Sequence, residues 1–193
     1  MSQKIITPNQ FQTSHWSGGD TTQLYIYPED ANFSDHDFLF RISSATFQST
    51  GSRFTDFSGY HRYLCALKGQ LSVAHNGEEL RPLAPYQIEE FSGSWDTRST
   101  NSLDCRDFNL IVREDLSSSV RVMNPKQEVR SQWESSWLAV FSVGDFTLEY
   151  AGKQHALSGK NLFLIETDRS QSLCLLQASK PVLLLEIEKN KPA

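Results

Sequence analysis

Long apolar runs are absent from this sequence, and no stretch approaches the roughly 20 consecutive apolar residues that span a lipid bilayer. The first residues, Met1 to Pro8, lack the apolar core of a secretory signal peptide. Cysteine is also scarce, with 3 among 193 residues at long and unpatterned spacings, which excludes a disulfide-rich secreted scaffold. These absences predict a cytoplasmic protein without a membrane partner.

Positive charge is too sparse for nucleic-acid binding. The chain has 18 Lys and Arg against 23 Asp and Glu, a net charge of -5, and its basic residues are scattered. No stripe of positive charge is available to follow a phosphate backbone, so we expect no nucleic-acid partner. A hydrophobic content of 38% that includes 12 Phe and 4 Trp is sufficient for a buried core.

One segment of the chain is repeated. The two copies begin at Gly69 and Gly144, which are 75 residues apart. In each copy the residues that match then occupy every second position, up to a second glycine that lies at a hairpin turn. Beyond these hairpins the offset becomes 77 residues, and Leu80 aligns with Leu157. A β-repeat of this length predicts two similar barrels or sandwiches in tandem.

Alternation of apolar and polar residues predicts strands over most of the chain, and no stretch keeps a helical period over three turns. The expected strands of the first copy cover residues 23–27, 38–47, 62–73, 87–91 and 107–112, and the pattern repeats over 133–187. Asn76-Gly77 is typical of a two-residue hairpin turn. We predict an all-β protein with an N-terminal barrel over residues 1–113, a polar linker over 114–130 and a C-terminal barrel over 131–193.

Spaced sequence blocks mark the first copy. They are Trp16-Ser17-Gly18-Gly19-Asp20-Thr21, Phe40-Arg41-Ile42-Ser43-x-Ala45, Gly51-x-x-Phe54-x-x-Phe57-x-Gly59-x-x-Arg62 with Leu67-x-Gly69, Phe91-x-Gly93, and Asp107-Phe108-Asn109-Leu110-x-x-Arg113. In this order, over about residues 16–113, they resemble the HutD/Ves family. The chain departs from that family in having Ser17 in place of Asn, Phe40 in place of the usual Trp, and Gln23 where an acidic residue is common.

The resemblance implies a fold and a function. The fold is a bicupin, two tandem cupin-like β-barrels of the RmlC-like jelly-roll type. HutD members are associated with histidine utilisation and have no established catalytic activity, which implies a small-molecule-binding protein with a regulatory role. Histidine breakdown passes through urocanate and N-formylglutamate, and both are anionic.

Many cupins hold a metal ion at residues with a characteristic spacing. A cupin metal site uses two histidines one residue apart, a glutamate shortly after them and a third histidine on a later strand. Counting back from Gly69 places the glutamate at Arg62, the paired histidines near Asp56 and Ser58, and the third ligand near Glu90. No position holds a histidine, so we predict no metal and no cofactor.

Arg62 at the would-be glutamate position needs an anion, because a guanidinium is always charged and offers five hydrogen-bond donors. Two alternatives stay open. Asp107 or Glu90 supplies the anion, and Arg62 is then structural; or a small ligand supplies a carboxylate or phosphate. The repeat aligns Arg62 with Trp137, which favours a closed apolar core in the second copy and a pocket in the first.

Two further strands carry polar residues on one face. Arg41 and Ser43 share a face, as do Asp107 and Asn109. Alternation alone leaves open that these faces are solvated. Because the family resemblance makes them motif positions, we predict a pocket for an acidic, amide-bearing metabolite. Its predicted ligand-binding residues are Arg62, Arg41, Ser43, Asp107, Asn109 and Thr21.

No catalytic residue is assigned, because no Cys, Ser or His has a recognisable activating neighbour. His75 and His155 lie beside hairpin turns, where we expect solvent exposure. Three functions stay open: a metal-free sensor of a small carboxylate, which is favoured; an enzyme acting on a small carboxylate or sugar derivative with Asp107 as acid or base; and a protein-interaction module. Assembly into a homodimer also stays open.

Overall fold

The computed structural model describes residues 2–123, 129–133, 137–167 and 171–189. In these ranges the chain forms strands and two short 3-10 helices, η1 (Pro8–Gln10) and η2 (Phe33–Asp35). None of the described helices has the length and apolarity of a membrane span. The chain divides into two compact units: a first-repeat unit, Phe11–Glu114, and a second-repeat unit, Met1–Gln10 with Asp115–Ala193.

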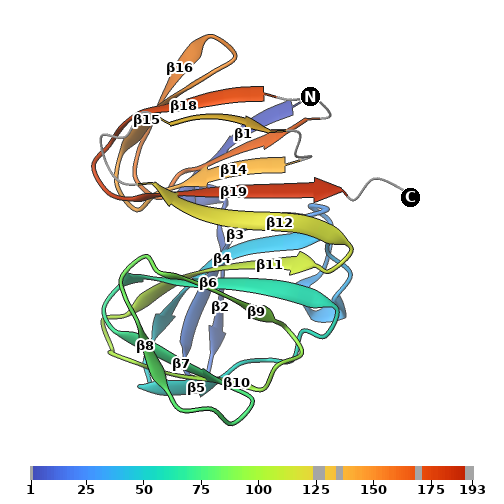
Figure 1. Ribbon diagram of the computed structural model, residues 1–193, viewed down its shortest axis with the longest axis vertical. Helices are drawn as coiled ribbons and strands as arrows, with labels where there is room; N and C mark the ends of the chain where they lie inside the picture. The colour runs from blue at the N-terminus through green and yellow to red at the C-terminus, as the bar shows by residue number, and fades with distance from the viewer. Residues whose placement is uncertain (1, 124–128, 134–136, 168–170, 190–193) are drawn as a thin grey trace. The chain divides into compact units, whose positions relative to one another are not determined.

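The first-repeat unit contains two antiparallel sheets (Figure 1). The six-stranded sheet has the order β2 (Gln12–Trp16), β3 (Gly19–Tyr27), β4 (Phe40–Phe47), β11 (Arg106–Arg113), β6 (Tyr60–Lys68) and β9 (Ile88–Ser92). The four-stranded sheet has the order β5 (Gly51–Arg53), β10 (Thr97–Asn101), β7 (Leu71–His75) and β8 (Arg81–Leu83). Side chains from β4, β6 and β7 pack together in one buried apolar cluster, so the two sheets enclose a common core.

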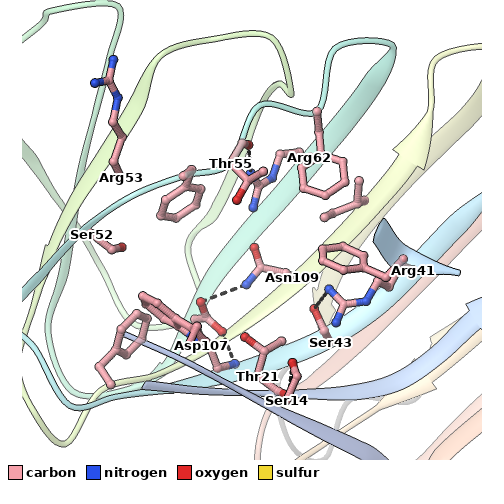
Figure 2. A pocket seen from close by; sticks show the side chains of 17 residues that line it. Ser14, Thr21, Arg41, Ser43, Ser52, Arg53, Thr55, Arg62, Asp107 and Asn109 are labelled. Atoms are coloured by element: carbon pink, nitrogen blue, oxygen red, sulfur yellow. Dashed lines mark hydrogen bonds between the residues drawn. The ribbon is translucent and has the colours of Figure 1, made fainter. Parts of the chain in front are cut away.

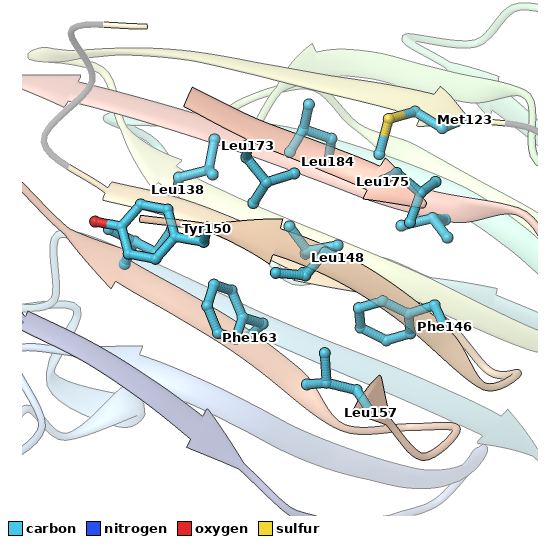
Figure 3. Packing of buried hydrophobic residues seen from close by; sticks show 13 residues of the cluster. Met123, Leu138, Phe146, Leu148, Tyr150, Leu157, Phe163, Leu173, Leu175 and Leu184 are labelled. Atoms are coloured by element: carbon cyan, nitrogen blue, oxygen red, sulfur yellow. The ribbon is translucent and has the colours of Figure 1, made fainter. Parts of the chain in front are cut away.

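The second-repeat unit also contains two sheets. The five-stranded sheet has the order β1 (Ser2–Ile6), β17 (Leu162–Glu166), β14 (Trp137–Phe141), β19 (Val182–Lys189) and β12 (Leu116–Met123). The four-stranded sheet has the order β13 (Val129–Trp133), β18 (Gln171–Ala178), β15 (Phe146–Tyr150) and β16 (Lys153–Leu157). Figure 3 shows large apolar side chains, among them Leu148 and Phe163, filling the space inside this unit.

A series of four strands in the larger sheet, and the whole smaller sheet, have the same order in the two units. The series β4-β11-β6-β9 corresponds to β12-β19-β14-β17, and β5-β10-β7-β8 corresponds to β13-β18-β15-β16. Both repeat hairpins turn through positive φ, at Asn76 and Gly77 in one copy and at Ala151 and Gly152 in the other. The all-β, bicupin prediction is confirmed: the chain forms two cupin-like jelly-roll units.

The alignment of Leu80 with Leu157 is wrong. Leu83 pairs with Leu71, as Leu157 pairs with Phe146. Leu83 is buried like Leu157, whereas Leu80 is exposed. The second copy therefore has one residue fewer than the first between these paired positions, where the sequence alignment predicted two more.

The unit boundaries differ from the sequence expectation at two places. Residues 116–123, expected in the linker over 114–130, form β12, which pairs with β19 at the edge of the five-stranded sheet. An edge strand needs few apolar residues, and the serine-rich composition of β12 therefore resembles that of a loop. Residues 124–128 of the expected linker lie outside the described residues. The N-terminal strand β1 pairs with β17 of the second-repeat unit, although residues 1–113 were expected to form one barrel.

Candidate functional site

A cavity of about 280 Å³ opens in the first-repeat unit, and all six predicted ligand-binding residues line it (Figure 2). Its wall also includes polar and aromatic residues that the sequence analysis did not assign. These are Ser14, Trp16, Phe33, Phe47, Ser52, Arg53, Phe54, Thr55 and Phe57, and the apolar Ala45 and Ile111 complete the wall. The volume equals that of about nine water molecules in the liquid, which suits a small metabolite.

Three neighbouring strands supply the charged floor of the cavity. Strand β11 lies between β4 and β6. Ile111 pairs with Arg41 on one side and with Arg62 on the other. Two residues earlier on β11, Asn109 pairs with Ser43. Paired residues on adjacent strands project to the same face of a sheet, so this register directs the polar side chains into one cavity.

Arg62 is buried and has no carboxylate partner. Its Nη1 donates to the Thr55 carbonyl oxygen at 3.3 Å, its Nε has no hydrogen-bond partner, and its guanidinium packs against the rings of Phe54 and Phe91. Among the described residues it forms no ion pair. Burial lowers the pKa of Arg62 to about 10; the charge of Asp107 opposes this and that of Arg41 adds to it. The guanidinium therefore stays protonated at neutral pH.

The two expected internal partners of Arg62 are otherwise engaged. Asp107 Oδ1 accepts from the Ala45 backbone N–H at 2.6 Å, and Oδ2 accepts from Asn109 Nδ2 at 2.9 Å. Glu90 is exposed and accepts from the Tyr63 hydroxyl at 3.3 Å. The alternative in which Arg62 is a member of an internal ion pair is therefore wrong for the described residues.

Arg41 is held by neutral groups. Its Nε donates to Gln23 Oε1 at 2.7 Å, and its Nη1 lies 3.5 Å from Ser43 Oγ. The ring of Phe33 lies 3.9 Å from the guanidinium carbon, a cation–π distance. Burial lowers the pKa of Arg41 to about 10. No described carboxylate pairs with Arg41 either.

Asp107 and Asn109 form a polar pair in the middle of the floor. Burial raises the pKa of Asp107 to about 6, against the opposing effects of the hydrogen bonds from the Ala45 N–H and the Asn109 amide and of the charges of Arg62 and Arg106. Asn109 Nδ2 faces the carboxylate, which leaves Asn109 Oδ1 buried and without a partner. Two buried polar atoms of residues in the cavity wall thus lack a hydrogen-bond partner, the acceptor Asn109 Oδ1 and the donor Arg62 Nε.

Of the four positions that a cupin metal would use, Arg62 lines the cavity, whereas Asp56, Ser58 and Glu90 do not. Asp56 accepts from the Ser58 backbone and hydroxyl in an exposed turn, and Glu90 is exposed. Within the described ranges, no three His, Cys, Asp or Glu side chains lie close enough to hold a metal ion. The arginine that lines the cavity at the glutamate position also repels a cation, so the residues present do not fit the metal chemistry of other cupins.

The expectation that His75 is exposed is wrong. His75 is buried, its Nε2 lies 3.0 Å from Glu89 Oε1, and its Nδ1 lies 2.9 Å from Thr97 Oγ1. The physical reason is strand alternation: Leu71 and Val73 face the core, and the residue two positions further does the same. His155 is partly buried, and its Nε2 has no partner.

Among its described residues, the second-repeat unit has no counterpart of the charged floor. Trp137, aligned with Arg62, is 1% exposed. This unit has a groove of about 650 Å³, lined by Asp145, Phe146, Thr147, Ala156, Leu157, Ser158, Gln177, Ala178 and Ser179. No basic residue lines the groove, and Asp145 accepts from the Gly159 backbone N–H at 2.8 Å. The charged, buried cavity lies in the first-repeat unit.

Comparison with models of known protein families identifies the family of this chain. Residues 8–184 match the family model described as HutD, which covers most of the sequence. The chain belongs to the HutD family. The family prediction is therefore confirmed, and it holds beyond the residues 16–113 on which the resemblance rested. No curated protein sequence matches this chain.

Solved structures with the same fold include members of this family. A conserved protein of unknown function from Pseudomonas aeruginosa, PA5104, is 23% identical with a TM-score of 0.87, covering 97% of this chain and 100% of its own. HutD from Pseudomonas fluorescens, in a structure titled as its formate condition, is 21% identical with a TM-score of 0.82, covering 98% and 100%. YhhW from Escherichia coli is 9% identical with a TM-score of 0.68, and both chains are fully covered.

Proposed function

We propose that the cavity of the first-repeat unit binds a small carboxylate metabolite, with Arg62 as its principal anchor and without a metal ion. Thr21, Ser43, Asp107 and Asn109 contribute polar contacts to the ligand. The role that we propose is that of a sensor or regulator in histidine metabolism, acting in the cytoplasm. A urocanate-like or N-formylglutamate-like carboxylate has the required charge.

The observation that supports this proposal is the state of Arg62. A buried charge is costly unless a counter-charge and hydrogen bonds compensate for it. Arg62 has an unpartnered buried Nε and no ion pair in the described part of the chain. The cavity beside it has room for the missing anion. Membership of the HutD family supports the association with histidine utilisation.

The experiment compares wild-type protein with Arg62→Met by isothermal titration against urocanate, N-formylglutamate and simple carboxylates. Met keeps most of the apolar stem and deletes the charge. We expect at least one carboxylate to bind the wild-type protein and the variant to lose ~2–5 kcal/mol of binding free energy. Arg53→Met is the matched control, because Arg53 lines the same cavity but is exposed and paired with Asp96. Equal binding by wild type and Arg62→Met would contradict the proposal.

A second candidate function is supported by Asp107. A carboxyl group with a pKa of about 6 in a cavity can act as a general acid or base near neutral pH. An enzyme would consume the bound carboxylate, and Asp107→Asn would abolish turnover while preserving binding. A sensor leaves the ligand unchanged. Incubation of the bound metabolite with stoichiometric protein, followed by mass spectrometry, distinguishes the two.

A further inference from the structure

We infer that the cavity binds its carboxylate together with one proton from solvent, which Asp107 takes up, and that the Asn109 amide then turns to donate to the ligand. The inference rests on the proposed function and adds the regulation of the same site by pH. It gives two residues of the cavity floor separate roles: Asp107 holds the proton, and Asn109 contacts the ligand.

Asp107 is the one carboxyl group among the described residues of the cavity wall, and no histidine lines that wall. Its side chain is buried, and its two oxygens accept from the Ala45 backbone N–H and from Asn109 Nδ2. Burial raises its pKa to about 6, against the effects of these hydrogen bonds and of the nearby arginines. At neutral pH the carboxyl group is therefore mostly ionised, and a modest further rise in its pKa would protonate it.

The other ionisable groups around Asp107 keep one charge state near neutral pH. They are four arginines and two thiols: Arg41 on β4, Arg53 on β5, Arg62 and Cys65 on β6, Cys105 directly before β11, and Arg106 on β11. Burial raises the pKa of both thiols to about 12, so they stay uncharged. The arginines stay protonated. Of these groups, only Asp107 changes its charge near neutral pH.

A bound carboxylate and the ionised Asp107 compete for the same positive charge. The charge of Arg62 lowers the pKa of Asp107 in the ligand-free protein. An anion that pairs with Arg62 cancels this effect and adds a like charge to a shared, buried site, where one of two carboxylates is then protonated. Ligand binding therefore raises the pKa of Asp107, and a proton enters from solvent.

Asn109 supplies the acceptor that this proton needs. Its Nδ2 now donates to Asp107 Oδ2 at 2.9 Å, and its Oδ1 is buried without a partner. Figure 2 shows the amide nitrogen turned toward Asp107 and the amide oxygen turned away from it. A half-turn of the amide exchanges the two atoms, so that Oδ1 accepts from the protonated carboxyl group and Nδ2 takes the former place of Oδ1.

The half-turn brings a new donor to the ligand. Arg62 pairs with Ile111, two residues after Asn109 on β11, so Asn109 and Arg62 are diagonal neighbours on one face of the sheet. A carboxylate held by Arg62 can thus accept from Asn109 Nδ2 as well. While Asp107 is ionised the amide cannot turn, because its oxygen would face a carboxylate. The proton and this ligand contact are therefore gained together.

The test is isothermal titration with N-formylglutamate, which has no group that titrates between about pH 6 and 8.5. For wild-type protein we expect affinity to fall by up to about tenfold for each pH unit above about 6. At pH 7.5 the binding enthalpies in phosphate and in Tris buffer should differ as the uptake of close to one proton requires. This comparison needs no variant, so it stands even if a substitution impairs folding.

Asp107→Asn imitates the protonated side chain. It should bind without proton uptake, with an affinity that does not change with pH and that exceeds the wild-type affinity at pH 8 by on the order of tenfold. Glu90→Gln is the control, because it makes the same change at an exposed carboxylate that does not line the cavity, and it should keep the wild-type pH profile.

Two results would overturn the proton-linked inference and leave the proposed function standing. One is a wild-type affinity that is independent of pH, with equal enthalpies in the two buffers; the other is a folded Asp107→Asn variant with the wild-type pH profile. Failure of both N-formylglutamate and acetate to bind wild-type protein at any of these pH values would overturn the inference and the proposed function together.

Discussion

Arg41 and Arg62 pair with the same residue, Ile111, from the two strands that flank β11. Two like charges are thereby placed on one inner face, and neither forms an ion pair with a described carboxylate. A stability-driven core would replace such residues by apolar ones, as the second-repeat unit does with Trp137. The arrangement is explained by a ligand that supplies the missing negative charge.

The first prediction concerns the stability of Arg62→Met without ligand. No carboxylate loses a hydrogen bond when Arg62 is removed, and an apolar side chain takes its buried place. We expect the free energy of unfolding in urea to stay within about 1 kcal/mol of wild type or to rise. A loss of roughly 3–5 kcal/mol is typical of a stranded buried charge and would show that Arg62 serves the fold.

The second prediction concerns the pH dependence of stability. Asp107 has a folded-state pKa of about 6, above the ordinary value of roughly 3.9. The folded protein holds this proton more tightly than the unfolded chain, so Asp107 favours folding at low pH and this contribution is lost as pH rises from about 4 to 6.

Asp107→Asn removes that dependence. The stability of wild type relative to Asp107→Asn should fall by on the order of 2–3 kcal/mol across this pH window and stay constant above it. Urea unfolding of both proteins at half-unit pH steps measures the difference. Parallel profiles would show that Asp107 has an ordinary pKa.

The third prediction concerns the buried contact between His75 and Glu89, which joins β7 of one sheet to β9 of the other. Truncation by His75→Ala leaves the buried Glu89 without one of its partners, and Arg81 alone remains beside it. We expect a loss of ~1–3 kcal/mol in unfolding free energy. His61→Ala on β6, where the side chain is partly exposed, is the control and should change stability by less than about 0.5 kcal/mol.

The fourth prediction separates the roles of the two units. Trp137 is fully buried at the position aligned with Arg62, and Trp137→Ala should cost ~3–5 kcal/mol of stability. Under conditions where this variant remains folded, its affinity for the carboxylate that binds wild-type protein should equal that of wild type. A selective loss of binding in the folded variant would mean that the second-repeat unit takes part in the site.

Much of the fold followed from local patterns. Alternation along Phe40–Phe47 and the glycines of the repeat hairpins indicated strands and tandem barrels, and both are present. The strand β12 was missed because edge strands share the polar composition of loops. His75 was misjudged from the turn that follows it, although its spacing from Leu71 and Val73 carried the correct signal.

The sequence predicts which residues form the candidate site, but not how their side chains are arranged. The family motif selected Arg41, Arg62 and Asp107, and all three line the cavity. Whether Arg62 pairs with Asp107 depends on how β6 and β11 align, and a shift in their register between Arg106 and Asp107 affects that alignment. The register between two strands whose paired residues lie roughly 40 or more positions apart in the sequence depends on tertiary contacts, and local sequence does not specify it. The contact between Gln23 and Arg41 could not be predicted either, because it lies beside a register shift between β3 and β4.

A crystal structure of the protein with the carboxylate that binds most tightly in titration tests the central claim most directly. We predict density for the ligand in the cavity of the first-repeat unit, with its carboxylate in hydrogen-bond contact with the guanidinium of Arg62. Density for that carboxylate elsewhere, or a saturated crystal in which Arg62 contacts only Thr55 and water, would contradict the account.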